Sequence, residues 1–170
     1  HRASAGAHVG GWRLTVRIAL YDGPASSWDT FVRSRADWSH FHLYGWRTIM
    51  ERVLGHECLY LSALEPDGAL AGVLPLVRVK SVLFGHYLVS MPFLNYGGPL
   101  GSDEAVAALA EHAAALAARQ HVTILELRSR TPLPLSLPVS HRKITVLMDI
   151  PPGGADALWK GFDAEVRSQI

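Results

Sequence analysis

The stretch ECLYLSALEPDGALAGVLPLVRVK, residues 57–80, decides the fold. Two apolar runs, 57–64 and 70–80, flank the loop Glu65-Pro66-Asp67-Gly68, whose Asp-Gly pair has the turn chemistry of a β-hairpin. The two runs are therefore predicted to pair as antiparallel strands. Pro75 has no N–H to donate, which indicates an edge position or a bulge in the second strand.

The residues before this hairpin predict one strand and two helices. Residues 12–20 alternate apolar and polar side chains, the period of two of a half-buried strand. A short helix is expected after Pro24, with Ser26 or Ser27 as its N-cap. A second helix is predicted over residues 43–54, with Gly55 as its stop. Its apolar stripe comprises Leu43, Trp46, Ile49, Met50, Val53 and Leu54.

The residues after the hairpin alternate between strand and helix patterns. Strands are predicted over 82–89, 122–128 and 144–150, and a helix from Ser102 or Asp103 to about Gln120. A last helix is predicted over 154–170, where Leu158, Phe162, Val166 and Ile170 recur every four residues. This stripe ends without a stop signal, so we expect the natural chain to continue.

Composition narrows the class of protein. The 170 residues suit one domain, and 49% hydrophobic with 18% charged residues excludes a disordered chain. Lysine and arginine number 16 against 15 acidic residues. The chain therefore lacks the excess of positive charge that would indicate binding to nucleic acid or to a membrane surface. No run of ~18 uncharged apolar residues predicts a membrane span. Residues 1–11 are small and Gly/Ala-rich, and we expect them to be a disordered lead-in.

The reactive residue types give little support to covalent or metal chemistry. Cys58, the only cysteine, lies in a predicted strand without a basic partner, which indicates a buried, inert thiol. There is no Gly-x-Ser-x-Gly nucleophile motif. His40 and His42, with His56 nearby, have a spacing that some metal sites use, but no acidic residue or cysteine completes a ligand set. No metal site is therefore predicted.

The most informative functional stretch is MPFLNYGGPL, residues 91–100. Its two prolines lack N–H groups and Gly97 and Gly98 lack Cβ atoms, so this backbone can approach a ligand closely. Tyr96 adds an aromatic face and a hydroxyl. We therefore take Tyr96, Gly97 and Gly98 as candidate substrate-binding residues. The alternative is a connecting loop whose Phe93 and Tyr96 fill the core.

Two further groups of residues could contact a ligand. Trp46 and Arg47 on the second helix could stack on and grip a substrate, although Trp46 also belongs to the apolar stripe and suits the core. Basic residues bracket a proline-rich loop and could meet an anion, although a solvated loop surface is the commoner explanation. They are Arg128, Arg130, Arg142 and Lys143.

The predicted order of strand, two helices, hairpin, strand, helix, two strands and helix favours an α+β domain with a central, mostly antiparallel sheet flanked by helices. This order resembles the GNAT acyltransferase fold. Several segments resemble the FemAB-like transferases, and the branch found with bacterial exosortase and exopolysaccharide systems is the most similar. They are Gly72 to Val77, Leu83 to Gly85, Met91 to Leu100, Leu158 to Lys160 and Glu165 to Ile170.

This resemblance implies the organisation of the complete protein. FemAB-like proteins join two GNAT-like halves around a groove, and residues 12–170 would be the first half, cut before the second. Tyr96, Gly97 and Gly98 would border the groove, and Arg167 matches a basic position on the helix that enters the second half. The partners would be the missing C-terminal half and an envelope precursor or small-molecule acceptor.

The resemblance also implies a reaction, in which an acyl donor reacts with an amine-bearing acceptor. The donor in the complete protein would be aminoacyl-tRNA or acyl-CoA, which makes tRNA a possible partner through the donor. The function expected is aminoacyl or peptidyl transfer to a cell-envelope or exopolysaccharide-related acceptor, in the cytoplasm. The alternative is a non-catalytic binding or scaffolding domain that shapes a groove with a partner domain.

The chain departs from coenzyme-A-dependent GNAT domains in one respect. It lacks the Gln/Arg-x-x-Gly-x-Gly/Ala turn that holds pyrophosphate on backbone N–H groups. The isolated chain is therefore expected to bind no cofactor of its own and to be inactive. Backbone N–H groups and Tyr96 could assist proton removal and stabilise an oxyanion, but no residue is a convincing general base, so the catalytic residues are unknown.

Overall fold

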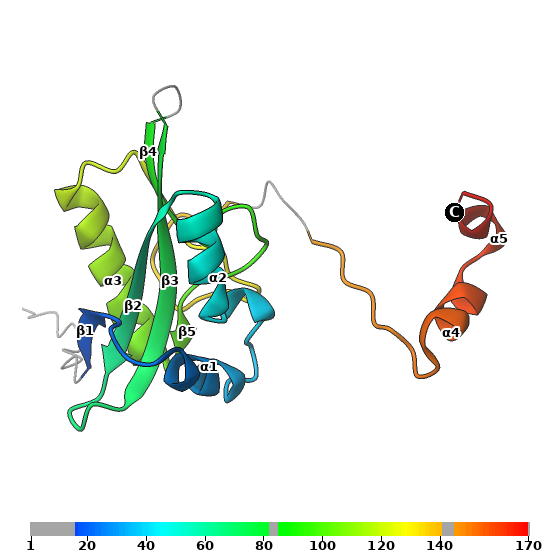
Figure 1. Ribbon diagram of the computed structural model, residues 1–170, viewed down its shortest axis with the longest axis horizontal. Helices are drawn as coiled ribbons and strands as arrows, with labels where there is room; N and C mark the ends of the chain where they lie inside the picture. The colour runs from blue at the N-terminus through cyan, green and yellow to red at the C-terminus, as the bar shows by residue number, and fades with distance from the viewer. Residues whose placement is uncertain (1–15, 82–84, 141–144, 170) are drawn as a thin grey trace, which may run out of the picture. The chain divides into compact units, whose positions relative to one another are not determined.

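The computed structural model describes residues 16–81, 85–140 and 145–169 (Figure 1). The predicted lead-in over residues 1–11 lies outside these ranges, as does the first part of the strand predicted over 12–20. The chain divides into two units after Leu137, and each is described by itself.

The first unit is built on an open sheet of six strands, which confirms the α+β class. The strands run in the order β1-β2-β3-β4-β6, and β5 pairs with β3. Every pairing is antiparallel except that of β4 with β6, which is parallel. The strands are β1 (Arg17–Leu20), β2 (Glu57–Leu64), β3 (Leu70–Ser81), β4 (Gly85–Ser90), β5 (Leu100–Gly101) and β6 (Ile124–Glu126). The sequence did not predict the two-residue β5.

The hairpin of β2 and β3 forms as predicted, but β3 is a central strand. Pro75 lies opposite Tyr60, whose carbonyl accepts the N–H of Tyr21 at 2.8 Å and therefore points away from β3. The nitrogen of Pro75 consequently faces the other edge of β3, between the residues paired with β5 and those paired with β4. Proline fits a central strand here because neither β4 nor β5, the strands at that edge, pairs with position 75.

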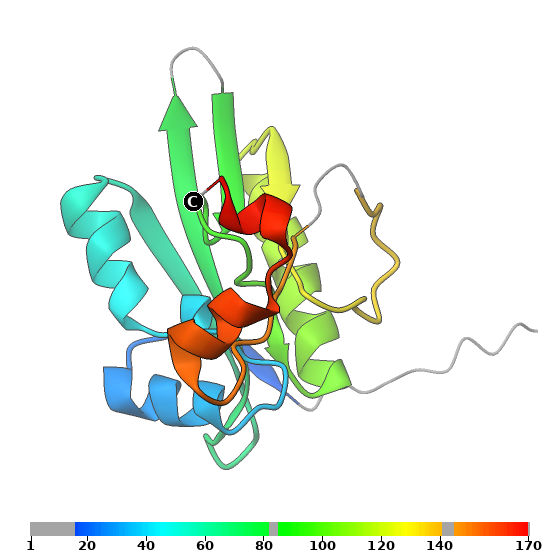
Figure 2. The same ribbon diagram turned by 90° about the vertical axis from the view of Figure 1, so that its right-hand side faces the viewer.

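Helices cover both faces of this sheet, with α3 on one face and α1 and α2 on the other (Figure 1 and Figure 2). As predicted, Ser102 caps α3, because its hydroxyl accepts the N–H of Ala105 at 3.3 Å. Helix α1 begins directly after Pro24, so Ser26 and Ser27 lie in its first turn and do not cap it. The helical segments of this unit are α1 (Ala25–Arg33), η1 (His40–His42), α2 (Gly45–Thr48), η2 (Ile49–Val53) and α3 (Asp103–Arg119).

The helix predicted over 43–54 is helical from Gly45, but its second half, η2, is a π-helix. Of the predicted apolar stripe only Met50 is fully buried, and Val53 is 74% exposed. A π-turn contains one residue more than an α-turn, so side chains at α-helical spacing drift off the common face. Gly55 ends the segment at φ 69°, as expected of a glycine stop.

The predicted strand at 122–128 is shorter than expected, because only Ile124–Glu126 pair with β4. The backbone N–H of Arg128 instead donates to the hydroxyl of Ser90 at 2.7 Å. The chain thus leaves the sheet beside the end of β4, which brings Arg128 to the loop that follows that strand.

Two predictions about the second unit were wrong. Residues 145–150 are irregular, and their apolar side chains are exposed because no described strand pairs with them. The single helix predicted over 154–170 is two helices, α4 (Gly154–Gly161) and α5 (Ala164–Arg167). Phe162 is extended between them and Asp163 takes the N-cap position of α5. Glycine weakens a helix interior and aspartate favours a cap, which accounts for the break.

No helix in the described ranges is long and apolar enough to cross a membrane.

Candidate functional site

The loop after β4, residues 91–99, has an unusual backbone. Met91 and Phe93 have φ angles of 55° and 67°, and Gly97 has 143°. The left-handed region costs a residue with a side chain about 1–2 kcal/mol, so two such residues in one loop need support from their surroundings. Strain of this kind concentrates at functional sites, which makes this loop the place to examine first.

Arg128 supplies that support. Its guanidinium donates to the carbonyl of Leu94 at 2.7 Å, and its own carbonyl accepts the N–H groups of Gly97 at 3.1 Å and Gly98 at 2.6 Å. The two glycine N–H groups are therefore occupied and cannot bind an oxyanion in this conformation. Arg128 alone, which lies after β6, thus holds both the middle of the loop and its glycine turn.

The two glycines are explained by contacts within the chain. A Cβ on Gly98 would lie 2.8 Å from the carbonyl oxygen of Arg128, and one on Gly97 would lie 2.5 Å from Cγ of Met91. Both distances are shorter than any real Cβ contact. Glycine is therefore needed at both positions for close packing, whether or not a ligand also approaches.

Tyr96 instead contributes to a surface that is open to solvent. Its ring lies 6.2 Å from that of Phe41, which in turn lies 6.2 Å from the ring of Trp46. The guanidinium of Arg130 sits 5.8 Å from the centre of the Tyr96 ring. We call this the aromatic surface, formed by His40, Phe41, Trp46, Tyr96 and Arg130. Phe41, Trp46 and Tyr96 are half-buried, and His40 and Arg130 are exposed.

Hydrogen bonds hold two parts of the aromatic surface in place. The indole N–H of Trp46 donates to the carbonyl of His40 at 2.9 Å, and the His42 ring bonds the Gly98 carbonyl at 3.1 Å. The structure therefore brings two of the predicted site residues, Trp46 and Tyr96, onto one surface, although they are fifty positions apart in the sequence. The sequence did not identify Phe41, which lies between them; the only signal was its place in the His-Phe-His triplet.

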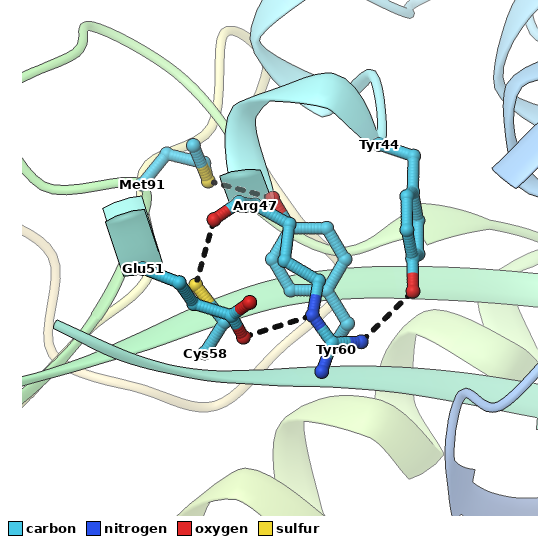
Figure 3. Close-up of polar contacts among 6 residues, drawn as sticks. All are labelled: Tyr44, Arg47, Glu51, Cys58, Tyr60 and Met91. Carbon is cyan, nitrogen blue, oxygen red and sulfur yellow. Dashed lines mark hydrogen bonds and ion pairs between the residues drawn. The ribbon is translucent and has the colours of Figure 1, made fainter. Parts of the chain in front are cut away.

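Arg47, also predicted to bind substrate, is engaged within the chain (Figure 3). Its guanidinium donates to Glu51 at 2.9 Å and to the hydroxyl of Tyr44 at 2.8 Å. It also lies 5.7 Å from the ring centres of both Tyr44 and Tyr60. These contacts satisfy its charge and fix α2 against the sheet. Arg167 lies exposed in α5, in the second unit.

Cys58 lies in the same cluster and is unsuited to nucleophilic attack. Burial above all, together with the nearby Glu51, raises the pKa of its thiol to about 12. Its Sγ lies 3.9 Å from the carbonyl of Arg47 (Figure 3). Because only the thiolate is a strong nucleophile, Cys58 is inert at neutral pH, as the sequence predicted.

His42 is the most enclosed histidine near the aromatic surface. It is buried, and desolvation lowers its pKa, although its bonds to Ser39 and Gly98 act in the opposite direction. Nδ1 accepts the backbone N–H of Ser39 at 3.2 Å, which assigns the ring proton to Nε2, facing Gly98. His42 therefore connects η1 to the glycine turn. No group of three metal-ligating residues occurs in the described ranges.

We expect acid to destabilise the protein through His42. Because its folded pKa lies below the unfolded value of about 6.5, the unfolded state binds more protons, and stability falls as pH drops through 6.5. The pKa of His112 is lowered too, so it adds to the same fall. Urea unfolding between pH 7.5 and 5 should show this slope, and His42→Gln should reduce it. An unchanged slope in both His42→Gln and His112→Gln would contradict the assignment.

Comparison of the sequence with protein-family models and with curated proteins gave no match.

Proposed function

We propose that this chain is the N-terminal half of a FemAB-like acyltransferase. The reaction would be aminoacyl or peptidyl transfer to an amine-bearing cell-envelope or exopolysaccharide-related acceptor. The observation that carries the proposal is the aromatic surface. The most distinctive motif of the resemblance, Pro92 to Gly98, is rigidly held and presents Tyr96 beside Phe41 and Trp46, where a substrate could bind.

The observed topology supports a GNAT-like fold for this half. Apart from the short β5, the chain as far as β6 runs as strand, helical segments, hairpin, strand, helix and strand, which agrees with the first part of the order on which the resemblance rests. The loop with the motif follows β4, and β6 returns beside β4 after α3. Tyr96 and Arg130 of the aromatic surface thus follow β4 and β6, which are neighbours in the sheet although they are not consecutive in the chain. In open sheets with parallel strands, ligands often bind at such a place.

The residues of this chain would bind and orient the substrate. Half-buried aromatic rings offer stacking area, Arg130 offers a positive charge, and Tyr96 offers a hydroxyl. The proton acceptor and the rest of the donor site would come from the second half, because Cys58 stays protonated and His42 is enclosed. The donor would be aminoacyl-tRNA or acyl-CoA bound by the complete protein, in the cytoplasm.

The test is transfer by the full-length protein. Label from a mixed pool of radioactive aminoacyl-tRNAs, or from radioactive acetyl-CoA, should appear on an envelope-precursor fraction. Tyr96→Ala and Trp46→Ala should each lower the rate roughly fivefold, because a stacking contact contributes about 1 kcal/mol. Val53→Ala, exposed in η2, is the matched control and should leave the rate unchanged.

The melting temperature separates binding from folding in this test. Variants that lose activity while melting within about 2 °C of the parent support a substrate-binding surface. Full activity in both Tyr96→Ala and Trp46→Ala would exclude it. Failure of the full-length protein to transfer from either donor would exclude the enzyme.

One observation favours the second candidate, a non-catalytic binding or scaffolding domain. The N–H groups of Gly97 and Gly98 are bonded to Arg128 and offer nothing to a developing oxyanion. Under this candidate the aromatic surface would still bind the envelope precursor. The full-length protein would then retain the precursor in a binding assay without transferring label, and Tyr96→Ala would weaken retention.

A further inference from the structure

An apolar pocket is lined in part by Pro92 and Phe93 of the 91–99 loop. Its volume is about 280 Å³, and most of its wall comes from side chains of β3, β4 and β6 that share one face of the sheet. The residues that line it are Val79, Tyr87, Val89, Pro92, Phe93, Ile124, Glu126 and Arg128. The pocket is open, and Ile124 at its rim is 49% exposed.

Phe93 is the most unusual residue of this pocket. Its side chain is 67% exposed although its backbone is held at φ 67°. A large apolar side chain on the surface and a left-handed backbone are each unfavourable, which makes Phe93 unusual. The ring stacks on that of His56, with centres 5.6 Å apart. Phe93 is thus held by His56 at the wall of the pocket.

The charge and size of the pocket restrict what can occupy it. Its charged side chains, Glu126 and Arg128, form an ion pair at 2.8 Å, so the wall carries no net charge. At roughly 30 Å³ for a group the size of a water molecule, the volume holds about nine such groups. An uncharged aliphatic chain fits in both respects.

We propose that this pocket binds an aliphatic chain of roughly six to eight carbons, as carried by an acyl group or a short prenyl alcohol, with Phe93 covering it. Burial of the chain against the strands removes apolar surface of both partners from water. The loop would then connect two binding surfaces, an aromatic one through Tyr96 and an aliphatic one through Phe93. The proposal does not depend on transfer activity.

The test is direct binding to the full chain, followed by NMR of the ¹⁵N-labelled protein. The probes are N-acetylcysteamine thioesters with acetyl, butyryl, hexanoyl, octanoyl and decanoyl groups, and geraniol in a separate arm. The dissociation constant should fall about fourfold per added methylene up to roughly eight carbons and then level off. Shifted resonances should map to the pocket residues. Tighter binding of geraniol than of the octanoyl thioester would assign the chain to a prenyl source, and the reverse to an acyl source.

Variants of the pocket keep the proposal falsifiable. Phe93→Gly should weaken octanoyl binding about tenfold without lowering the melting temperature, because glycine adopts φ 67° without strain. Ile124→Ala alters the opposite wall and should also weaken binding, whereas Val53→Ala, which lies outside the pocket, should not. Dissociation constants independent of chain length, or unchanged in both pocket variants, would overturn the proposal.

Discussion

Replacing Gly98 by valine is expected to lower the free energy of unfolding by about 3 kcal/mol and the melting temperature by about 10 °C. The new Cβ would lie 2.8 Å from the carbonyl oxygen of Arg128, and backbone on both sides leaves little room to adjust. Separation of the two segments would also break the 2.6 Å bond between the Gly98 N–H and that carbonyl. Thermal and urea unfolding measure the loss.

A matched control distinguishes this clash from a general intolerance of valine. A Cβ on Gly45, at the start of α2, would meet no atom within 4 Å, so Gly45→Val should change the melting temperature by no more than about 2 °C. A Gly98→Val protein with the parent melting temperature would show that the turn can move away from Arg128. In that case only loss of transfer could reveal a binding role for Gly98.

Replacing Trp28 by alanine is expected to cost about 4 kcal/mol, in the range of large-to-small changes at fully buried aromatic residues. Trp28 has no exposed surface, and its ring lies 5.0 to 5.8 Å from the rings of Tyr21, Tyr44 and Tyr60. Its indole N–H also donates to the carbonyl of His42 at 2.7 Å. The cavity would therefore lie directly beneath the residue that supports the glycine turn. Urea unfolding gives the free energy.

Trp28→Phe separates the packing from the hydrogen bond. It retains most of the apolar volume but leaves the buried His42 carbonyl without its donor, which should cost about 1–3 kcal/mol. If Trp28 also positions the aromatic surface through His42, the fluorescence of Trp46 should change in both variants. A Trp28→Ala protein that unfolds with the parent free energy would contradict the packing described here.

Part of the fold could be predicted because it depends on local chemistry. The 57–80 hairpin follows from two apolar runs and an Asp-Gly turn, and α3 follows from a serine cap and its apolar face. The inert state of Cys58 follows from its place in an apolar strand. Each of these predictions used signals contained within about twenty residues.

Other predictions were wrong because they depend on partners elsewhere in the chain. Residues 145–150 have the composition of a strand, but a strand needs a neighbour to bond, and none of the described strands pairs with them. Pro75 suggested an edge strand, yet β3 is central because its other edge is shared by two different strands. The prediction of one helix over 154–170 was wrong for a local reason, because it overlooked the weak helix propensity of Gly161 and the capping tendency of Asp163.

The candidate site shows the same division. The sequence by itself indicated a loop before Leu100, the first residue of β5, and showed that Gly97 and Gly98 allow a close approach to its backbone. Only the tertiary structure placed Phe41 between Trp46 and Tyr96, turned Arg47 toward Glu51 and made Arg128 the anchor of the loop. Periodicity reports which face of an element is apolar, whereas contacts between distant elements depend on how the strands pair. The pairing of β4 with β6 brings Arg128 beside Gly98, and no pattern along the chain predicts that these two residues are in contact.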